Sequence, residues 1–335
     1  MKQHHHHQSG KVAVLAAVIG NSTVTVLKFI VFFMSGSTAM FAEGVHTFAD
    51  SMNQILLYVG IKKSAKKADD KFSYGYGKER FFWAILSACG IFFIGSGVTL
   101  YHGVEGLLHP SQIENYGYTY IVLILSFIIE GFTLYIALHS VYRKELGLMK
   151  SIKEADNASY AVILEDSVAV LGVTVAFFAI LLTKVTGILY FDSIGSILIG
   201  ILLGGVAILL IKENKSFLMG KGLDDYTKEG IIELIEADPL IIKVIDFKSE
   251  VIDLDAYIIK CEVEFNGTAL MKEINKHDFL VNEYEDAKDT YEEFLRFCVD
   301  YANRIPRLIG KNIDTLEGKI KKHYPEIRHI DVELN

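Results

Sequence analysis

Six apolar stretches, each about as long as a lipid bilayer is thick, constrain this chain more than any other feature. A helix needs roughly 20 mainly apolar residues to cross the hydrocarbon core of a membrane. The stretches that reach this length are Val12–Phe33, Thr38–Ile61, Phe81–Leu107, Tyr118–Val141, Tyr160–Leu182 and Ile188–Ile211. The sequence therefore predicts six membrane-spanning helices, with the lipid bilayer as their surroundings.

Charge divides the 335 residues into a membrane part and a soluble part. Residues 1–212 carry a net charge of +2, whereas residues 213–335 carry −10. We expect a flexible tail over residues 1–11, a membrane domain over residues 12–212 and a soluble domain over residues 213–335. An acidic soluble domain argues against nucleic acid as a partner, because nucleic-acid binding needs clustered Lys and Arg.

Basic residues alternate between the connectors. The connector after the second stretch holds seven Lys and Arg residues and the one after the fourth holds four, whereas the first, third and fifth hold at most one. Positive residues of membrane proteins stay on the cytoplasmic side. The pattern predicts that both termini and the acidic domain are cytoplasmic. With no leader or transit peptide recognised, we expect a multi-pass protein of a prokaryotic cell membrane.

The histidine run at the N-terminus and the three cysteines could each bind metal, but neither set has the spacing of a site. His4–His7 precedes the first stretch, and we interpret it as a tag remnant or an inert tail, the alternative being a metal-gathering arm. Cys89, Cys261 and Cys298 are isolated in the sequence. We therefore expect reduced thiols and no disulfide framework.

Ionisable side chains inside the second stretch predict a metal-binding site. His46 and Asp50 are four residues apart, so on a helix they share one face, where an imidazole and a carboxylate can ligate one ion. A rise of 1.5 Å per residue places Asp50 about 18 Å from Thr38, near the bilayer midplane. Asp166 of the fifth stretch reaches roughly the same level. We expect these three side chains to bind a divalent metal ion in transit.

Two further carboxylates lie close to this level. Glu130 of the fourth stretch lies about 18 Å from the outer end of that stretch, and Glu43 precedes His46 by about one helical turn. Buried carboxylates that lie together require a cation or protons to neutralise them. Glu130 and Glu43 are therefore further candidate ligands. The alternative is a structural polar network that includes Lys28 and Asn21 of the first stretch.

Small residues recur on two of the stretches. The sixth carries Ser196, Gly200 and Gly204 at four-residue spacing, and the third is also rich in glycine. Such rows let helices approach closely in a membrane. We expect the third and sixth stretches to pack on each other or on a second protomer.

The soluble part alternates between helical and strand-like patterns. We expect a helix at Thr227–Glu236, strands at Lys243–Glu250 and Ala256–Phe265, and a helical insertion at Met271–Glu285. A long helix follows at Thr290–His323, interrupted near Pro306, and a last strand at Ile327–Leu334. The scattered His277, His323 and His329 show no paired ligand spacing and are interpreted as surface or structural residues.

Four strings of the sequence resemble the cation diffusion facilitator family, and within it the zinc transporter nine-like branch. They are AEGVHTFADSMNQILLYVG, SFIIEGFTLYIAL, VILEDSVAVLG and PEIRHIDVEL. The resemblance implies a homodimeric antiporter that exports divalent cations, usually zinc, from the cytoplasm in exchange for protons. It implies six transmembrane helices followed by a small cytoplasmic α+β domain of the ferredoxin-like kind, and it carries over His46, Asp50 and Asp166 as ligands.

The sequence departs from the family pattern at two places. Val162 stands four residues before Asp166, where the family usually has His or Asp, so a tetrahedral site would need a fourth ligand from water or another side chain. Glu130 is our first candidate. Tyr76 occupies a connector position where a metal-binding His is common, and we predict no second metal site there.

These observations predict a secondary active transporter and no enzyme, with Zn²⁺ as cargo, protons as counter-ion and no cofactor. One imidazole with several carboxylates is a hard ligand set, so an exporter that prefers Mn²⁺ or Fe²⁺, with Co²⁺ as a further cargo, is an alternative. A membrane protein that senses metal without transporting it is another. An intramembrane metal-dependent hydrolase is disfavoured, because no HExxH or comparable motif supplies a general base.

Overall fold

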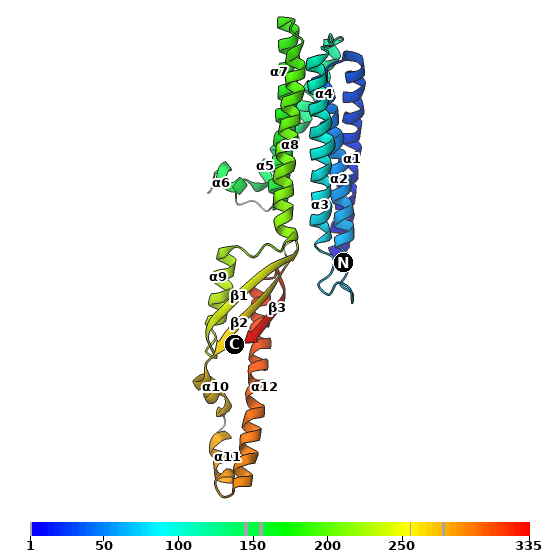
Figure 1. Ribbon diagram of the computed structural model, residues 1–335. Helices are drawn as coiled ribbons and strands as arrows, with labels where there is room; N and C mark the ends of the chain where they lie inside the picture. Colours follow the sequence, from blue (N-terminus) through cyan, green and yellow to red (C-terminus); the bar gives the residue numbers. More distant parts are fainter. Residues whose placement is uncertain (1, 144–146, 154–156, 255, 277–278) are drawn as a thin grey trace. The chain divides into compact units, whose positions relative to one another are not determined.

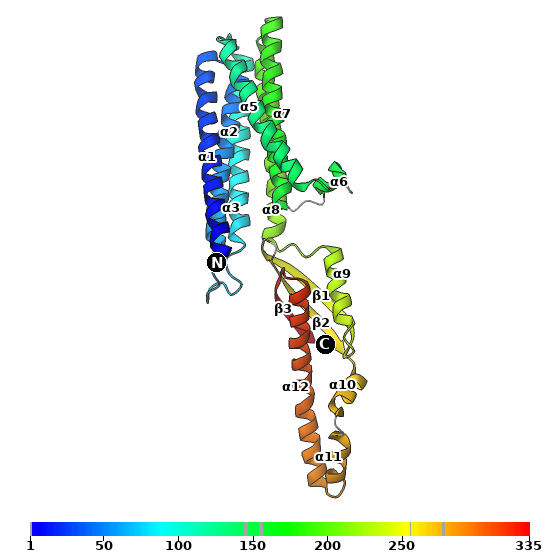
Figure 2. The same cartoon turned by 180° about the vertical axis from the view of Figure 1, so that it is seen from behind.

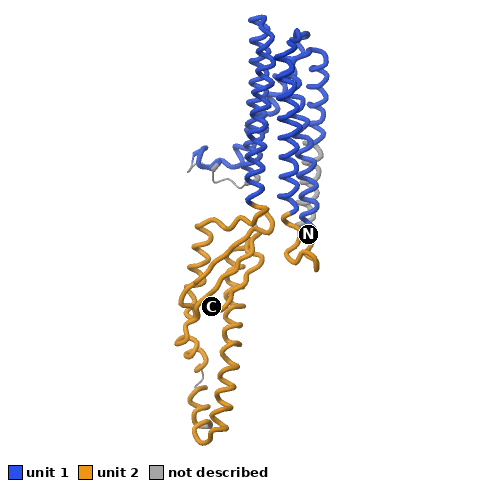
Figure 3. Tube along the Cα trace, viewed as in Figure 1, with its two compact units in different colours: residues 1–66, 79–216 blue, residues 67–78, 217–335 orange. Residues whose placement is uncertain are grey.

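The computed structural model describes all residues except 1, 144–146, 154–156, 255 and 277–278. The side chains of residues 1–17, 153–158 and 286 also lie outside the described part, and the interpretation of His4–His7 falls there. The chain divides into two compact units, residues 1–66 with 79–216 and residues 67–78 with 217–335 (Figure 3). The connector 67–78 thus belongs to the second unit, which is called the soluble unit after the prediction made for residues 213–335.

The first unit consists of helices in its described part (Figure 1). They are α1 (Lys2–Ser35), α2 (Thr38–Ser64), α3 (Glu79–Gly90), the π-helix η1 (Ile91–Ser96), α4 (Gly97–Leu108), α5 (Tyr116–Val141), α6 (Leu148–Lys153), α7 (Asn157–Thr186) and α8 (Tyr190–Leu218). α3, η1 and α4 follow one another without a break and form the predicted third span. Helix α1 begins at Lys2, so the segment 1–11, expected to be a flexible tail, is helical where it is described; it contains no proline that would break a helix.

Five helical segments of the described chain are long and apolar enough to cross a membrane. They are Val18–Ser35, Glu79–Leu108, Tyr116–Val141, Ser159–Thr186 and Tyr190–Leu218. Helix α2, the predicted second span, is not among these segments, and polar residues such as Glu43, His46 and Asp50 interrupt its apolar sequence. It packs against α1, α3, α4 and α7, and Figures 1 and 2 show it running beside α1 and α3. Its polar side chains can therefore point into the unit.

Small residues bring the third span and α8 together, as the sequence predicts. A Cβ added to Gly103 would lie 2.7 Å from the Ile197 side chain, which shows how closely the two backbones approach. Ser96 donates a hydrogen bond of 2.7 Å to the carbonyl of Gly200, and Ser196 donates one of 3.3 Å to the carbonyl of Thr99. Serine hydroxyls thus join the same helices through backbone acceptors.

The soluble unit contains a three-stranded sheet with helices. Its elements are α9 (Asp225–Glu236), β1 (Ile241–Asp253), β2 (Ala256–Phe265), α10 (Gly267–Ile274), α11 (Phe279–Ala287), α12 (Tyr291–His323) and β3 (Ile327–Leu334). The strand order is β1-β2-β3, with β1 antiparallel and β3 parallel to β2. Ile231 and Ile235 of α9, Ile259 of β2, and Leu316 and Ile320 of α12 share one core.

Two expectations for the soluble unit are corrected. The helix expected to be interrupted near Pro306 runs unbroken through it as α12. Proline removes the hydrogen bond to the carbonyl four residues earlier, but that residue, Ala302, is exposed, so water can satisfy the carbonyl. The insertion Met271–Glu285 forms two helices, α10 and α11, rather than one.

The burial of Cys261 predicts a thiol that alkylating agents cannot reach. Cys261 is 2% exposed on β2, and burial, with Asp331 and Glu317 nearby, raises the pKa of its thiol to about 12. Because the thiolate is the reactive form, its population at pH 8 falls by roughly a thousandfold relative to an ordinary cysteine. Iodoacetamide followed by peptide mass spectrometry should label Cys261 only after denaturation and label the half-buried Cys298 in the folded chain. Equal labelling in the folded chain would contradict this burial.

Candidate functional site

The first turn of α2 is fixed by an aspartate from α8. The carboxylate of Asp192 accepts hydrogen bonds from the Ser37 hydroxyl (2.6 Å), the Thr38 backbone N–H (2.5 Å) and hydroxyl (2.9 Å), and the Ala39 N–H (3.3 Å). A carboxylate at a helix N-terminus satisfies N–H groups that have no partner within the helix and interacts well with the helix dipole. Asp192 therefore holds the helix that carries the predicted site.

His46 and Asp50 face each other on α2, as their spacing predicts. His46 Nε2 lies 3.4 Å from Asp50 Oδ2. The imidazole is buried, whereas the Asp50 side chain keeps 29% of its surface exposed. The pair thus combines an enclosed imidazole with a carboxylate that is only partly enclosed.

Asp166 enters from α7, which packs against α2. Its half-buried carboxylate lies within electrostatic range of Asp50 and beside Thr133 of α5. Within the described chain, however, no three His, Cys, Asp or Glu side chains are close enough together to hold a metal ion. The structure thus pairs His46 with Asp50 and places Asp166 near them, and a three-ligand site requires these helices to move closer.

Glu43 and Glu130 lie together around Lys28 of α1. The Lys28 Nζ is 2.8 Å from Glu43 Oε2 and 3.0 Å from Glu130 Oε1, and it donates a third hydrogen bond of 2.9 Å to the Thr47 hydroxyl. Lys28 and Glu43 are fully buried. Both candidate ligands therefore take part in the polar network with Lys28 that was the alternative interpretation. Each glutamate is held to the ammonium through one of its two carboxylate oxygens.

A glycine of α7 makes room for this part of α2. A Cβ on Gly172 would lie 2.7 Å from Glu43 Oε1 and 3.6 Å from His46 Nδ1. The Lys28 network and the His46–Asp50 pair therefore meet at one point on the α7 backbone. A side chain at position 172 would therefore displace the end of the Glu43 carboxylate, whereas His46 would be in ordinary van der Waals contact with it.

A second polar chain joins α3, α2 and α7. Asn53 donates hydrogen bonds of 3.0 and 3.1 Å to the carboxylate of Glu165 and accepts one of 2.6 Å from Ser87. Glu165 of α7 is thus bonded to a neighbouring helix. Ser87 was missed, because a lone serine in an apolar stretch has no distinctive pattern in the sequence.

The remaining predicted positions are on α7 and outside the helical unit. Val162, one turn before Asp166 on α7, is 47% exposed. Tyr76 donates a hydrogen bond of 2.9 Å to Asp69 within the connector, and the His329 ring lies 5.2 Å from the Tyr74 ring. Nδ1 of His323 lies 2.9 Å from the Lys319 carbonyl, whereas His277 is outside the described residues.

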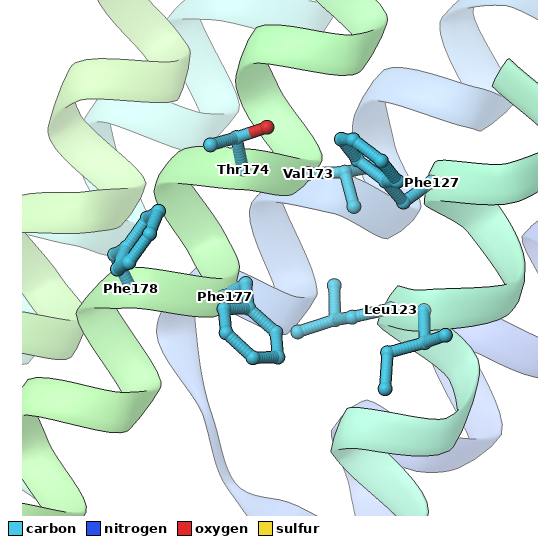
Figure 4. A pocket seen from close by; sticks show the side chains of 7 residues that line it. Leu123, Phe127, Val173, Thr174, Phe177 and Phe178 are labelled. Carbon is cyan, nitrogen blue, oxygen red and sulfur yellow. The ribbon is translucent and has the colours of Figure 1, made fainter. Parts of the chain in front are cut away.

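An apolar cavity lies between parts of α5 and α7, two helices that also pack against each other (Figure 4). It has a volume of about 270 Å³. Its lining residues are Leu123, Ile124, Phe127, Val173, Thr174, Phe177 and Phe178. The Thr174 hydroxyl already donates to the Val170 carbonyl. A cavity with this lining offers no metal ligand, so the ionisable residues, not the cavity, mark the site.

Comparison with known proteins places the same residues within a family domain. A model of the cation efflux transmembrane domain matches residues 14–219. The chain is 36% identical over 333 residues to the mitochondrial proton-coupled zinc antiporter SLC30A9 of Homo sapiens, covering 97% of this chain and 58% of that protein. The chain thus spans little more than half the length of this relative.

Two other relatives are similar over most of this chain. Metal tolerance protein C4 of Arabidopsis thaliana is 35% identical over 338 residues, which covers 98% of this chain and 74% of the plant protein. The cation-efflux pump FieF of Shewanella oneidensis is 26% identical over 265 residues, covering 78% of this chain and 84% of the pump. The similarity therefore extends beyond the helical unit into the soluble unit.

The contact at Gly172 predicts a local loss of stability. Gly172→Ala should lower the free energy of unfolding by about 1–3 kcal/mol, because the new Cβ forces the Glu43 carboxylate, which Lys28 holds, to move. Gly205→Ala in α8 is the matched control, since nothing lies within 4 Å of a Cβ there. Thermal unfolding of the detergent-solubilised chain measures both. Equal midpoints for the two variants would show that α7 does not approach α2 this closely.

Proposed function

The chain belongs to the cation diffusion facilitator family, and we propose that it carries divalent metal ions, zinc foremost, across a membrane in exchange for protons. The observation that carries this proposal is the His46–Asp50 pair, enclosed in the helical unit within the region that the family domain matches. An imidazole and a carboxylate are ligands suited to zinc. Relatives named as a zinc antiporter, a metal tolerance protein and a cation-efflux pump support the same class of cargo.

In this proposal α2 also crosses the membrane, second along the chain, and brings the number of spans to six. Its 27 residues extend over about 40 Å at 1.5 Å per residue, which exceeds the hydrocarbon core. Its polar residues Glu43, His46 and Thr47 are buried, so they do not require it to leave the bilayer. The charge of the connectors then orients both termini and the soluble unit toward the cytoplasm. A homodimer, which the family resemblance implies, is part of the same proposal.

Metal binding gathers His46, Asp50 and Asp166 around one ion. His46 gives up its proton when its nitrogen binds the metal, because ligand nitrogens must be unprotonated. On the other side of the membrane, protons compete for the same imidazole, whose proton affinity lies in the physiological range. The exchange of metal for protons then follows from one site that faces each side in turn.

The fourth position of a tetrahedral zinc site is open to two ligands. Water can take it without any change in the Lys28 network. Glu130, the first candidate from the sequence, is held by Lys28 Nζ at 3.0 Å through its Oε1, so its carboxylate is constrained by that contact. Water therefore requires the smaller rearrangement. If water holds the fourth position, a histidine introduced at position 162 should be able to replace it as a ligand. If the protein already supplies four ligands, the same histidine should change little.

Removal of the pair should abolish transport. We expect His46→Ala with Asp50→Ala to lower zinc uptake into proteoliposomes driven by a proton gradient by about 100-fold or more, since even outer-shell partners of metal ligands contribute about 10- to 100-fold. His139→Ala is the control, because His139 is an exposed histidine at the end of α5. Undiminished uptake by the double variant would reject the site. Metal binding without uptake by the unmodified chain would favour a sensor.

A histidine introduced at Val162 should change the metal preference. Val162→His adds an imidazole four residues before Asp166, and imidazole favours zinc over manganese. The ratio of Zn²⁺ to Mn²⁺ uptake should rise relative to that of Val162→Ala, which adds no ligand. An unchanged ratio would count against an incomplete site, and Mn²⁺ or Fe²⁺ as the best cargo of the unmodified chain would favour the alternative exporter.

A further inference from the structure

Lys28 is surrounded as a bound metal ion would be. Its ammonium has three N–H donors, and these reach Glu43, Thr47 and Glu130 at 2.8, 2.9 and 3.0 Å. The acceptors come from α2 and α5, and Lys28 itself comes from α1. Three helices therefore converge on one positive charge. A buried lysine in a membrane span is costly unless it is paired, and here its donors are all engaged.

The two carboxylates keep unused acceptor capacity. Glu43 Oε1 and Glu130 Oε2 are buried and have no hydrogen-bond partner among the described residues. One ammonium also faces two carboxyl groups, so the group carries a net negative charge when both glutamates are ionised. Two converging carboxylates with free oxygens, a hydroxyl and excess negative charge are a ligand set for a hard divalent cation. Lys28 occupies the centre of that set.

This group borders the predicted metal pair. Glu43 and Thr47 lie three residues before and one residue after His46 on α2. Glu43 Oε1 and His46 Nδ1 both face the backbone of Gly172. A divalent ion between Glu43 and Glu130 would therefore lie next to one held by His46 and Asp50, and without the ammonium nothing in the described cluster would keep it out.

We propose that Lys28 determines metal stoichiometry: its ammonium fills a second divalent-cation site made by Glu43 and Glu130 and so limits the chain to one transported ion. The proposal rests on the proposed function, in which His46 and Asp50 hold that ion. Lys28 limits the number of bound ions because its ammonium occupies the second site. It does not contact the ion held by His46 and Asp50.

The test counts metal ions bound to the full-length chain in detergent. Equilibrium dialysis against buffered Zn²⁺, and separately Mn²⁺, followed by elemental analysis gives ions per chain. Lys28→Met should bind one ion more than the unmodified chain, and Lys28→Arg, which keeps the charge, should bind the same number. Adding Glu43→Gln and Glu130→Gln to Lys28→Met should remove the extra ion. An unchanged count in Lys28→Met overturns the proposal, whereas a merely structural lysine would not raise the count.

A second background separates this proposal from the proposed function. In a chain with His46→Ala and Asp50→Ala, metal binding should fall by one ion, and Lys28→Met in that background should restore one. If the first two substitutions change nothing, the proposed function fails; if they lower the count but Lys28→Met does not restore it, only the present inference fails.

Folding of the lysine variant is informative in either direction. Loss of one partner from a buried ion group is strongly destabilising, so Lys28→Met can require metal in order to fold. In that case its unfolding midpoint should rise with added Zn²⁺ or Mn²⁺ by more than that of the unmodified chain. Failure of both Lys28→Met and Lys28→Gln to fold at any metal concentration would overturn the proposal, because a metal ion should replace the ammonium.

Discussion

An ionised side chain among lipid tails costs several kcal/mol unless it is paired or hydrated, and the helical unit is organised around this cost. Helix α2, which carries the polar residues, packs against α1, α3, α4 and α7. These more apolar helices can face the lipid, so the polar residues of α2 do not have to. Lys28 brings a compensating positive charge from α1 to Glu43 and Glu130. A helix too polar to qualify as a span by composition is thereby compatible with a membrane.

Close packing by small residues also helps to enclose polar groups within the helical unit. The third span reaches α8 through Gly103 and Ser96, whose partners are a neighbouring side chain and a backbone carbonyl. Gly172 lets α7 approach α2 in the same way, at the point where Glu43 and His46 face the α7 backbone. In both places the absence of a side chain on one helix lets polar groups on the next be enclosed.

Local patterns predicted much of the fold. The bounds of β2 and β3 match the expectation residue for residue, because their Ile- and Val-rich patterns mark them clearly. Strand β1 is longer than expected at both ends, since its pairing with β2 continues through register shifts that alternation cannot reveal. The unbroken helix at Pro306 depends on exposure of the preceding turn, which a sequence pattern does not supply.

The arrangement of the site was predictable from the sequence only for residues on the same helix. Spacing alone placed His46 and Asp50 on one face. For Glu43 and Glu130 the rise per residue gives their depth but not the direction in which they point, and that direction follows from how α1, α2 and α5 pack. Lys28 therefore entered the sequence interpretation only as part of an alternative, and its three contacts became clear from tertiary structure.

The clamp between Asp192 and the first turn of α2 has a mechanical consequence. Four hydrogen bonds to one carboxylate prevent that end of α2 from sliding along α8. The remaining freedom is rotation about a pivot near Thr38, and displacement then grows with distance along the helix. A tilt of about 10° moves Asp50, about 18 Å away, by about 3 Å. Such a lever arm can bring Asp50 toward Asp166 or withdraw it while the pivot stays still.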